Sequence, residues 1–389
     1  MAMGTLFTAT VESISAGGSG ALHFQGRCIF VEDTVPGDTI TGRIFREHTG
    51  WSQGETVEIL EPSPDRRIPE CGLFGTCGGC SLQHLAYETQ VTEKARILRE
   101  ALRRIGGLLD PPEPNCYASP PWEYRNRVQL HCIRPFHPGA VGFKRRRGDA
   151  IIPLADCPTA DPGIRRVLRE KQLLPPPEQD RFTLYSRFNT LLGAGGRRRG
   201  SVSLLNRELL MDAGVFFQSN GIMLEVLIQD LMRWAHEADP SLPMADLYCG
   251  VGTFAAFLQD RFPRIDLVEQ NPAALALARE NVRGKGIRYA ALTGDQWIKT
   301  LPHPLIYGFM VVDPPRQGLS PGLLQRLAQG GPPLLAYVSC DPATLARDTR
   351  ALISGGYTLS ALNLYDFYPQ TSHIESLGIF TRGKTIDGA

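Results

Sequence analysis

From about residue 214 the chain alternates short apolar runs with stretches in which apolar residues recur at helical spacing. The helical spacing covers 222–236, 253–260, 272–283 and a stretch near 322–329. The apolar runs are MADLY, RIDLVEQ, FMVVDPP and LLAYVSC, which begin at residues 244, 264, 309 and 334. Continuous apolar runs are typical of buried strands, and strands that alternate with helices indicate a parallel sheet. We therefore predict an α/β fold with a doubly wound, Rossmann-like sheet in this half of the chain.

The first half of the chain has a different pattern. Residues 5–61 contain short β-type segments separated by glycine and proline, which is typical of a small barrel or sandwich. Apolar residues between 85 and 105 recur at helical spacing, and 115–200 mixes candidate strands with a candidate helix at 164–173. We predict three domains: a β-barrel at 1–62, a mixed central domain at 63–213 and the α/β domain at 214–389.

Composition narrows the class of protein. Of the 389 residues, 42% are hydrophobic and 21% are charged, as in an ordinary globular protein, and no apolar run approaches the roughly 20 residues of a membrane helix. The first residues lack the basic and apolar regions of a secretory signal, and the nine cysteines fit metal binding or catalysis better than disulfides. We expect a cytoplasmic protein, and the sequence indicates neither a membrane nor an obligate protein partner.

The net charge of +1 conceals an uneven distribution. Residues 1–93 carry a net charge of −7, residues 94–200 of +11 and residues 201–389 of −3. The basic excess includes the runs 144–147 and 197–199, which we expect in exposed loops. Basic runs of this kind neutralise phosphates or form a solvated charged face. The middle of the chain is thus a candidate contact for nucleic acid.

The turn after the strand MADLY carries the first chemical signal. In Asp246-Leu-Tyr-Cys-Gly250-Val-Gly252, two glycines let the backbone approach a ligand beside the amide-rich start of a helix. Glu269 ends the next strand, 19 residues after Gly250, where a carboxylate can accept hydrogen bonds from both hydroxyls of a ribose. A plain tight turn is the simpler alternative, but the position of Glu269 favours a nucleoside ligand.

Two further strand ends are expected at the same edge of the sheet. Asp313 follows one strand and Cys340 follows another. A buried cysteine is usually inert, but a helix that starts near Thr344 would lower the thiol pKa and favour a nucleophile. A thiolate that adds to C6 of a pyrimidine makes C5 nucleophilic, and a base must later remove the C5 proton. Glu375 and His373 are the candidates for this base.

Four cysteines form a second candidate site. Cys71, Cys77 and Cys80 lie in a glycine-rich stretch, and Cys157, which precedes a proline, follows far downstream. Four thiolates suit either a tetrahedral zinc ion or a [4Fe-4S] cluster. Zinc ribbons usually bring two close pairs of cysteines, so the isolated fourth cysteine favours an iron–sulfur cluster, with zinc as the alternative.

Together these motifs resemble a known family, the RNA uracil-C5 methyltransferases that use S-adenosylmethionine and have a TRAM domain and an iron–sulfur cluster. The likeness covers nearly the whole chain. It is carried by FFQSN (216–220), DLYCGVGTF (246–254), VEQNPAALALAREN (268–281), VVDPPRQGL (311–319), YVSCDPATLARD (337–348) and FYPQTSHIES (367–376). The resemblance implies a class I methyltransferase domain, a TRAM-like (OB-like) N-terminal barrel and a central domain that holds the cluster.

The resemblance also implies roles for individual residues. Cys340 would be the nucleophile and Glu375 the proton acceptor. The residues implied at the methyl donor and the base are Gln218, Tyr248, Thr253, Glu269, Asp295 and Asp313, and those implied at the cluster are Cys71, Cys77, Cys80 and Cys157. The family usually has asparagine after the nucleophile, whereas this chain has Asp341, whose charge would raise the thiol pKa if it faced the sulfur.

The implied function is methylation of uridine C5 in structured RNA. A TRAM domain together with a cluster resembles the ribosomal enzymes, so 23S rRNA is the favoured substrate and tRNA the alternative. A non-catalytic RNA-docking factor and a methyltransferase for DNA or a small molecule are further alternatives. We expect the cluster to be structural, the acidic N-terminal domain to act as a docking element, and most phosphate contacts to come from 94–200.

Overall fold

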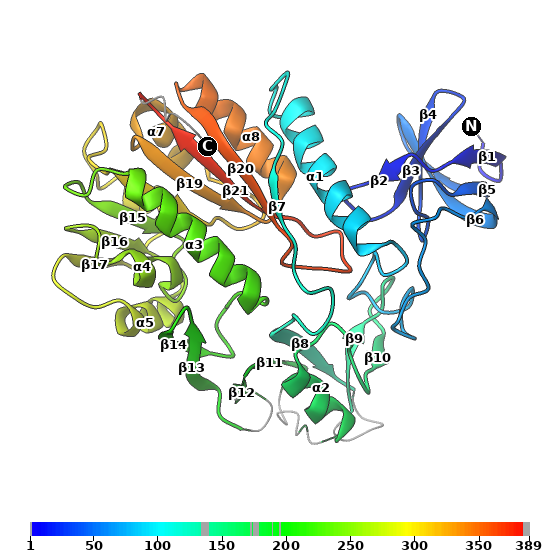
Figure 1. Ribbon diagram of the computed structural model, residues 1–389, viewed down its shortest axis with the longest axis horizontal. Helices are drawn as coiled ribbons and strands as arrows, with labels where there is room; N and C mark the ends of the chain where they lie inside the picture. Colours follow the sequence, from blue (N-terminus) through cyan, green and yellow to red (C-terminus); the bar gives the residue numbers. More distant parts are fainter. Residues whose placement is uncertain are drawn as a thin grey trace.

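The computed structural model of the chain describes residues 2–133, 140–171, 173, 179–188, 190–193 and 196–383. The strands of this part form a six-stranded N-terminal sheet, a five-stranded central sheet, a two-stranded hairpin and an eight-stranded C-terminal sheet. Figure 1 shows the N-terminal and C-terminal sheets on opposite sides of helix α1 (Tyr87–Arg104), with the central sheet below them.

The N-terminal sheet surrounds a small apolar core. Its strands are β1 (Leu6–Thr10), β2 (Ser13–Ile14), β3 (Gly20–Phe24), β4 (Arg27–Val31), β5 (Thr39–Glu47) and β6 (Trp51–Glu61). They lie in the order β1-β5-β6-β4-β3-β2. The Phe7 ring fills the centre, and a Cβ on Gly42 would lie only 2.3 Å from it, so glycine is required there for close packing. The β-rich pattern predicted for 5–61 is confirmed.

The central sheet lies in the order β10-β9-β8-β11-β12. Its strands are β8 (Arg127–Cys132), β9 (Val141–Lys144), β10 (Ile151–Pro153), β11 (Arg181–Arg187) and β12 (Thr190–Leu192). Helix α2 (Pro162–Arg169) begins where the Asp161 side chain accepts a hydrogen bond from the Gly163 amide, and it packs Ile164 onto the sheet. The helix predicted at 164–173 therefore starts two residues earlier and ends at Arg169.

The C-terminal sheet has the predicted doubly wound arrangement. Its strands are β15 (Met244–Leu247), β16 (Ile265–Val268), β17 (Ile287–Ala290), β18 (Phe309–Val312), β19 (Leu334–Ser339), β20 (Thr358–Tyr365), β21 (Glu375–Thr381) and, at one edge, β7 (Asn115–Tyr117). Their order is β17-β16-β15-β18-β19-β21-β20-β7, and β21 runs antiparallel to both of its neighbours. Every residue of β15, β16, β18 and β19 is buried, which explains why these strands are continuous apolar runs.

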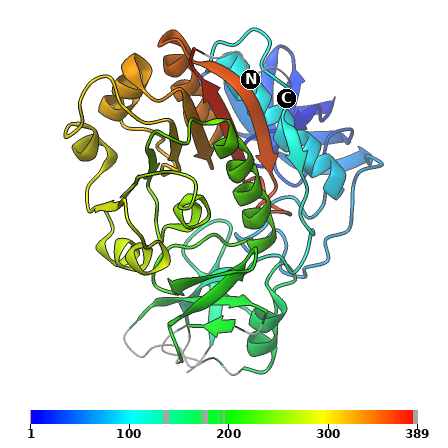
Figure 2. The same ribbon diagram turned by 60° about the vertical axis from the view of Figure 1, so that its left-hand side comes forward.

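Helices cover both faces of the C-terminal sheet. One face carries α3 (Gly221–Glu237), α4 (Thr253–Leu258) and α5 (Pro272–Asn281), and the other carries α1, α6 (Gly294–Ile298), α7 (Pro321–Gly330) and α8 (Pro342–Ser354). Successive residues of β18 point to opposite faces, so Phe309 joins the first core and Met310 the second. Figure 2 shows α3 in front of the strands. Within the described ranges, no helix combines the length and apolar character needed to cross a membrane.

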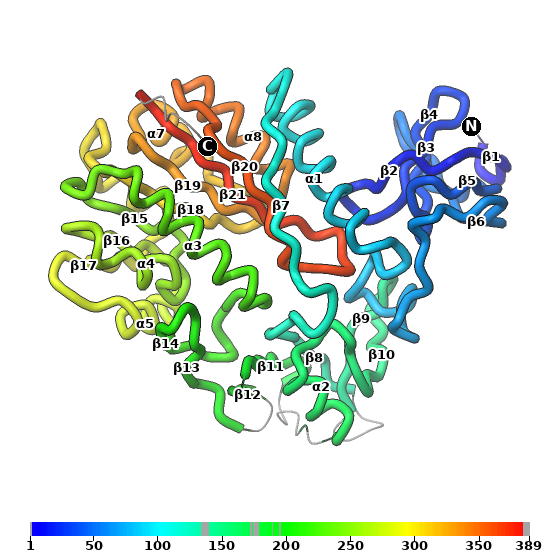
Figure 3. Tube along the Cα trace, in the orientation of Figure 1, coloured from blue at the N-terminus to red at the C-terminus, as the bar shows by residue number. Residues whose placement is uncertain are grey.

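Three elements outside 214–389 pack against the C-terminal sheet. Helix α1 contributes Leu98 and Leu102 to the second core, and β7 pairs in parallel with β20. The hairpin of β13 (Arg199–Leu204) and β14 (Arg207–Asp212) joins the first core. Figure 3 shows the chain running from α1 through β7 beside the C-terminal sheet before it enters the central sheet. The C-terminal sheet is thus completed by segments that precede residue 214, which supply a covering helix and an edge strand, and the boundary at 213 stays a prediction.

Candidate active site

The glycine turn between β15 and α4 is held in a left-handed conformation. Tyr248, Gly250 and Gly252 have φ angles of 62°, 54° and 79°. A Cβ on Gly252 would lie 2.9 Å from the Val282 side chain, so glycine permits both the backbone angle and the packing of the turn on α5. Asp246 at the end of β15 accepts a hydrogen bond from the Ala255 amide at 3.1 Å, which fixes the turn to the first turn of α4.

Glu269 lies immediately after β16 and closes the other side of this turn. Its carboxylate accepts hydrogen bonds from the Gly250 amide at 3.1 Å and the Asn271 amide at 2.7 Å. Each carboxylate oxygen has two lone pairs, so both oxygens can still accept hydrogen bonds from a ligand. The position of Glu269 beside the glycine turn is therefore compatible with the predicted contact to the hydroxyls of a ribose.

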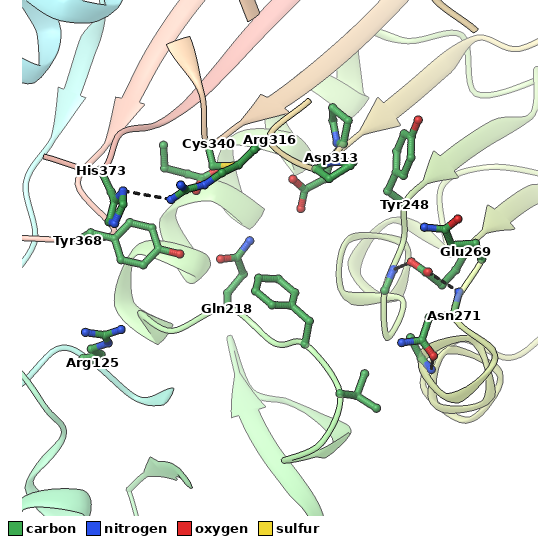
Figure 4. Close-up of a pocket in the computed structure, with 18 of the residues that line it drawn as sticks. Arg125, Gln218, Tyr248, Glu269, Asn271, Asp313, Arg316, Cys340, Tyr368 and His373 are labelled. Carbon is green, nitrogen blue, oxygen red and sulfur yellow. Dashed lines mark hydrogen bonds between the residues drawn. The ribbon is translucent and has the colours of Figure 1, made fainter. Parts of the chain in front are cut away.

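A cavity of about 630 Å³ lies beyond the carboxyl ends of these strands, and we call it the reaction cavity. Predicted residues that line it are Gln218, Tyr248, Glu269, Asp313, Cys340, His373 and Glu375. In Figure 4, Tyr248, Glu269 and Asn271 lie at one end of the reaction cavity, and Cys340, His373 and Tyr368 lie at the other.

Two of the predicted contact residues do not line the reaction cavity. Thr253 begins helix α4, and Asp295 accepts a hydrogen bond from the Leu323 amide at 2.8 Å near the start of α7. Asp295 therefore satisfies a backbone amide at a helix end in this structure. The roles of Thr253 and Asp295 at a ligand stay predictions.

Sheet register brings Cys340 and Glu375 together. Strand β21 is antiparallel to β19, and the last pair in their register joins Ser339 to Ser376. The next residues, Cys340 and Glu375, are therefore opposite each other at the end of the two strands. Glu375 is only 2% exposed, and both residues line the reaction cavity. A thiol and a carboxyl group from segments 35 residues apart in sequence thus share one site.

The pKa of the Cys340 thiol is raised to about 11, mainly by burial and then by the charges of Glu375 and Asp313. The predicted lowering of this pKa by a helix N-terminus is wrong, because burial and two carboxyl groups outweigh the effect of the helix. Helix α8 begins at Pro342, two residues before the predicted start. The Asp341 side chain caps it by accepting a hydrogen bond from the Thr344 amide at 2.9 Å, and its charge contributes less to the thiol pKa than those of Glu375 and Asp313.

The other ionisable groups near the thiol are shifted toward their neutral forms. Burial raises the pKa of Glu375 well above its ordinary value, with a further contribution from Asp313, whose own pKa is raised to about 7 by burial. Burial, followed by the charge of Arg316, lowers the pKa of His373 to about 4. His373 Nδ1 lies 3.2 Å from Nη2 of Arg316, so the neutral imidazole accepts this hydrogen bond.

The four predicted cysteine ligands line a second, smaller cavity. Cys71, Cys77, Cys80 and Cys157 surround a space of about 20 Å³, and we call it the cysteine cavity. Burial raises the pKa of Cys80 to about 12. In the described part of the chain, no three His, Cys, Asp or Glu side chains form a group that could hold a single metal ion. The cysteines are therefore gathered around one space, and the group they bind stays a prediction.

Arg125 is a site residue that sequence reasoning missed. It lines both the reaction cavity and the cysteine cavity. Burial lowers the pKa of its guanidinium, and the neighbouring ionisable groups Tyr124, Cys157 and Cys80 raise this pKa by more. Figure 4 places Arg125 on the side of the reaction cavity where Tyr368 lies. A single arginine before a strand carries no sequence signal that would have distinguished it from the other basic residues of the middle region.

Several arginines of the two basic runs form ion pairs with carboxylates of the same chain. Arg146 forms an ion pair with Asp33 at 2.6 Å and Arg147 with Glu32 at 2.8 Å, so part of the run 144–147 neutralises the acidic N-terminal sheet. In the second run, Arg198 pairs with Asp212 at 3.1 Å. Carboxylates within the chain therefore already bind several guanidinium groups of these runs, and the expected phosphate contacts of residues 94–200 stay a prediction.

The strand order and the groups at the strand ends define a Rossmann-like methyltransferase domain. A family model described as "Methyltransferase small domain" matches residues 207–335, and one described as "tRNA (Uracil-5-)-methyltransferase" matches residues 304–383. Among solved structures, the tRNA (uracil-54, C5)-methyltransferase of Pyrococcus abyssi, in complex with S-adenosyl-L-homocysteine, has a TM-score of 0.71 and 22% identity. The alignment covers 96% of this chain and 100% of that one, which confirms the class I methyltransferase fold.

Curated relatives extend the likeness to the whole chain. A protein of Treponema denticola named as an uncharacterized RNA methyltransferase is 34% identical, and the match covers 92% of this chain and 94% of that protein. The 23S rRNA (uracil(1939)-C(5))-methyltransferase RlmD of Azoarcus sp. is 31% identical, and the match covers 96% of this chain and 99% of that protein. The chain therefore belongs to the RNA uracil-C5 methyltransferase family. It is an enzyme of that class, so the alternative of a non-catalytic docking factor is set aside.

Proposed function

We propose that this enzyme transfers a methyl group from S-adenosylmethionine to C5 of a specific uridine in structured RNA, with 23S rRNA as its substrate. The observation that supports this most strongly is the register of β19 and β21, which sets Cys340 opposite Glu375 in the cavity that Glu269 also lines. Methylation of a pyrimidine carbon requires a nucleophile, a base and a bound methyl donor. The reaction cavity offers residues for all three.

The end of the reaction cavity near the glycine turn fits the methyl donor. Glu269 keeps lone pairs for the ribose hydroxyls, and Tyr248 and Asn271 line the same end. Oε1 of Gln218 is buried in the reaction cavity with no hydrogen-bond partner in the described structure. An unsatisfied buried acceptor costs about 1–3 kcal/mol, so a donor group such as the ammonium of a bound amino acid would stabilise it. S-adenosylmethionine, when bound, supplies an electrophilic methyl group on a positively charged sulfur.

The other end of the reaction cavity provides the groups for the covalent steps. After its thiol proton has passed to solvent, the Cys340 sulfur forms a bond to C6 of the uracil, and the electron pair of the C5–C6 double bond moves toward the C4 carbonyl to give an enolate. C5 then holds the electron pair that would form a bond to the methyl carbon of bound S-adenosylmethionine, whose methyl C–S bond would break with its electrons going to the donor sulfur. Glu375 accepts the proton of C5, the C5–C6 double bond forms again, and the C6–S bond breaks with its electrons returning to sulfur.

The raised pKa values fit a site that is activated by binding. Burial raises the pKa of both Cys340 and Glu375 and so disfavours both charged forms in the free enzyme. Arg316 opposes this effect on both groups and is the local cation that favours their ionised forms. A carboxylate with a raised pKa is also a stronger base, which suits the removal of a proton from carbon.

The choice of RNA is the finer part of the proposal. The relative named as a 23S rRNA methyltransferase is 31% identical over nearly the full length of both chains, and this supports rRNA. A tRNA substrate is the second candidate, because the family model that matches 304–383 is described by tRNA methylation. Mapping of 5-methyluridine in total RNA from cells with and without this gene tests the proposal. We expect one methyluridine to disappear from 23S rRNA, and loss from tRNA instead would select the second candidate.

We further propose that Cys71, Cys77, Cys80 and Cys157 hold a [4Fe-4S] cluster with a structural role. Four thiols around one cavity support this proposal. The cluster supplies electron-transfer chemistry, which the methylation does not use. Iron and sulfide in anaerobically purified protein would support the cluster, and stoichiometric zinc would contradict it.

The N-terminal sheet is proposed as a TRAM-like docking element for RNA, and the division at residues 62 and 213 as the domain boundaries. The ion pairs of Arg146 and Arg147 with Asp33 and Glu32 fix this sheet to the central one. Substitution of Asp33 and Glu32 by alanine would free these guanidinium groups. We expect the salt dependence of RNA binding to become steeper in this variant, because more phosphates would be neutralised.

A further inference from the structure

The loop between β20 and β21 contains a residue in an unusual backbone conformation. Gln370 has a φ angle of 66°, in the left-handed region that a side chain other than glycine rarely adopts. This conformation costs on the order of 1 kcal/mol and persists only where the surroundings hold it. The loop also carries Tyr368 and His373, which line the reaction cavity, and it leads directly to Glu375.

Gln370 is held by the side chain of Gln90 on helix α1, and we call this pair the Gln90–Gln370 clamp. The Gln370 amide donates to Oε1 of Gln90 at 2.9 Å, and Nε2 of Gln90 donates to Oε1 of Gln370 at 3.0 Å. The same Nε2 of Gln90 also lies within hydrogen-bond distance of the carbonyls of Leu82 and Leu85, at 3.0 and 2.9 Å. Both glutamines are buried, so these bonds are protected from competition with water.

Helix α1 and Ser81, the residue that follows Cys80, hold other positions of the same loop. Lys94, one turn after Gln90 on the same face of α1, donates to Asp366 at 2.6 Å and to the Tyr368 carbonyl at 3.0 Å. The Ser81 amide donates to the Gln370 carbonyl at 3.0 Å, and its hydroxyl accepts from the Ser372 amide at 3.0 Å.

These contacts connect the cysteine segment, residues 71–80, to the reaction cavity. Ser81 directly follows Cys80, which lines the cysteine cavity, and Gly78 and Gly79 line the reaction cavity. The loop from 366 to 374 is therefore fixed from two sides, by α1 and by the chain that leaves the cysteines.

We infer that the Gln90–Gln370 clamp is a positioning device for the last step of the reaction, the removal of the C5 proton. The pair Tyr365–Glu375 is the pair of β20 and β21 next to the loop, so the loop that joins these two residues determines how firmly Glu375 is held. Cys340, in contrast, follows β19 and precedes α8, whose own backbone bonds fix it. Loosening the clamp should therefore slow proton removal while sulfur addition and methyl transfer continue. The inference rests on the proposed role of Glu375 as the base.

The variant Gln90→Ala tests the inference, with Glu93→Ala as its matched control. Glu93 is also a buried polar residue of α1, but its carboxylate accepts from the Ile14 amide at 2.6 Å and so faces the N-terminal sheet. With a 23S rRNA fragment that contains the mapped uridine, we expect Gln90→Ala to accumulate a covalent protein–RNA adduct on denaturing gels. Its kcat should fall about tenfold or more and its KM for RNA should fall in parallel, so that kcat/KM and the rate of single-turnover methyl transfer change by less than about threefold.

Several outcomes would overturn the inference. Equal slowing of methyl transfer and release, absence of the adduct, or the same adduct in Glu93→Ala would each mean that the clamp only stabilises the fold. If Gln90→Ala does not fold, Gln370→Gly tests the inference instead. Glycine adopts the left-handed conformation, so this variant loses only the hydrogen bond from Nε2 of Gln90 to the Gln370 side chain. We expect a smaller accumulation of adduct in this variant, and no accumulation would overturn the inference.

The variant Glu375→Gln, measured in parallel, separates this inference from the proposed function. If Glu375→Gln turns over normally, Glu375 is not the base, and both the proposed step and the inference are wrong. If Glu375→Gln accumulates the adduct and Gln90→Ala does not, the inference about the clamp alone is wrong.

Discussion

The residues at the two cavities are held by different kinds of structure. In the reaction cavity, Glu269, Asp313 and Cys340 directly follow β16, β18 and β19, so sheet register sets their relative positions. In the cysteine cavity, the segment 71–80 contains turns and one isolated β-bridge, and Cys157 lies in a loop before α2. Chemical substitutions in the first cavity should therefore change the reaction and leave the fold intact. Substitutions in the second should change the fold first and the reaction as a consequence.

The largest effect is expected from Cys340→Ala. Without the sulfur no bond to C6 forms, so methylation should fall by at least about 10⁴-fold, while binding of S-adenosylmethionine and the Tm stay close to those of the wild type. Methylation is measured as methyl transfer to RNA, and binding of S-adenosylmethionine is measured by calorimetry. Cys116→Ala is the control, because Cys116 is exposed and does not line either cavity. Undiminished methylation by Cys340→Ala would disprove the proposed mechanism.

The next effect is expected from Glu375→Gln. The amide cannot accept the C5 proton, so turnover should fall by about 10²–10⁴-fold, and a methylated covalent protein–RNA adduct should accumulate. A denaturing gel with labelled RNA detects the adduct. His373→Gln is the informative comparison, because His373 is the other candidate base in the same cavity. If only His373→Gln accumulated the adduct, the roles of the two residues would be exchanged.

A change in the cysteine cavity should act mainly on stability. Cys157→Ser removes one of the four proposed ligands, so we expect loss of bound iron and sulfide and a Tm lower by roughly 5 °C or more. Turnover by the protein that remains folded should fall less than in the two variants above. Cys132→Ser is the control, since Cys132 does not line the cysteine cavity. A Cys157→Ser protein with full metal content and an unchanged Tm would contradict the proposed site.

The smallest effect concerns pH and the buried carboxyl groups near the reaction cavity. The pKa of Asp246 is raised to about 8 by burial, above its ordinary value of 3.8. The folded state therefore binds a proton that the unfolded state releases, and the stability from this group is present below pH 4 and lost as pH rises to about 8. Without ligands, the Tm should fall by a few °C between roughly pH 5 and 8, and Asp246→Asn should reduce this fall.

A control for this measurement is Asp38→Asn in the N-terminal sheet. Hydrogen bonds from Arg66 and from backbone amides lower the pKa of Asp38 despite its burial, so this group does not release a proton between pH 5 and 8. The pH dependence of the Tm in that variant should match the wild type. The same flattening in both variants would show that the effect does not come from Asp246.

Local sequence patterns predicted the parts of the molecule that local forces determine. The fully buried strands are continuous apolar runs, the glycine turn needs left-handed angles, and Cys340 and Glu375 come from motifs near strand ends. The pairing of β21 with β19 was not predictable in this way, because strand order depends on contacts distant in sequence. The thiol pKa was predicted in the wrong direction for the same reason: burial, and after it the charges of Glu375 and Asp313, raise this pKa, and all of them arise only in the tertiary fold.

The pairing of β7 with β20 has a consequence for how the chain folds during synthesis. Asn115 of β7 donates to Asn363 of β20, a residue that the ribosome adds 248 positions later. The edge strand and helix α1 must therefore wait, unpaired, until almost the entire polypeptide has emerged, while the N-terminal and central sheets can already form. Contacts between such distant segments slow folding. A nascent chain stalled before residue 358 would expose the apolar side of α1 and become a target for chaperones.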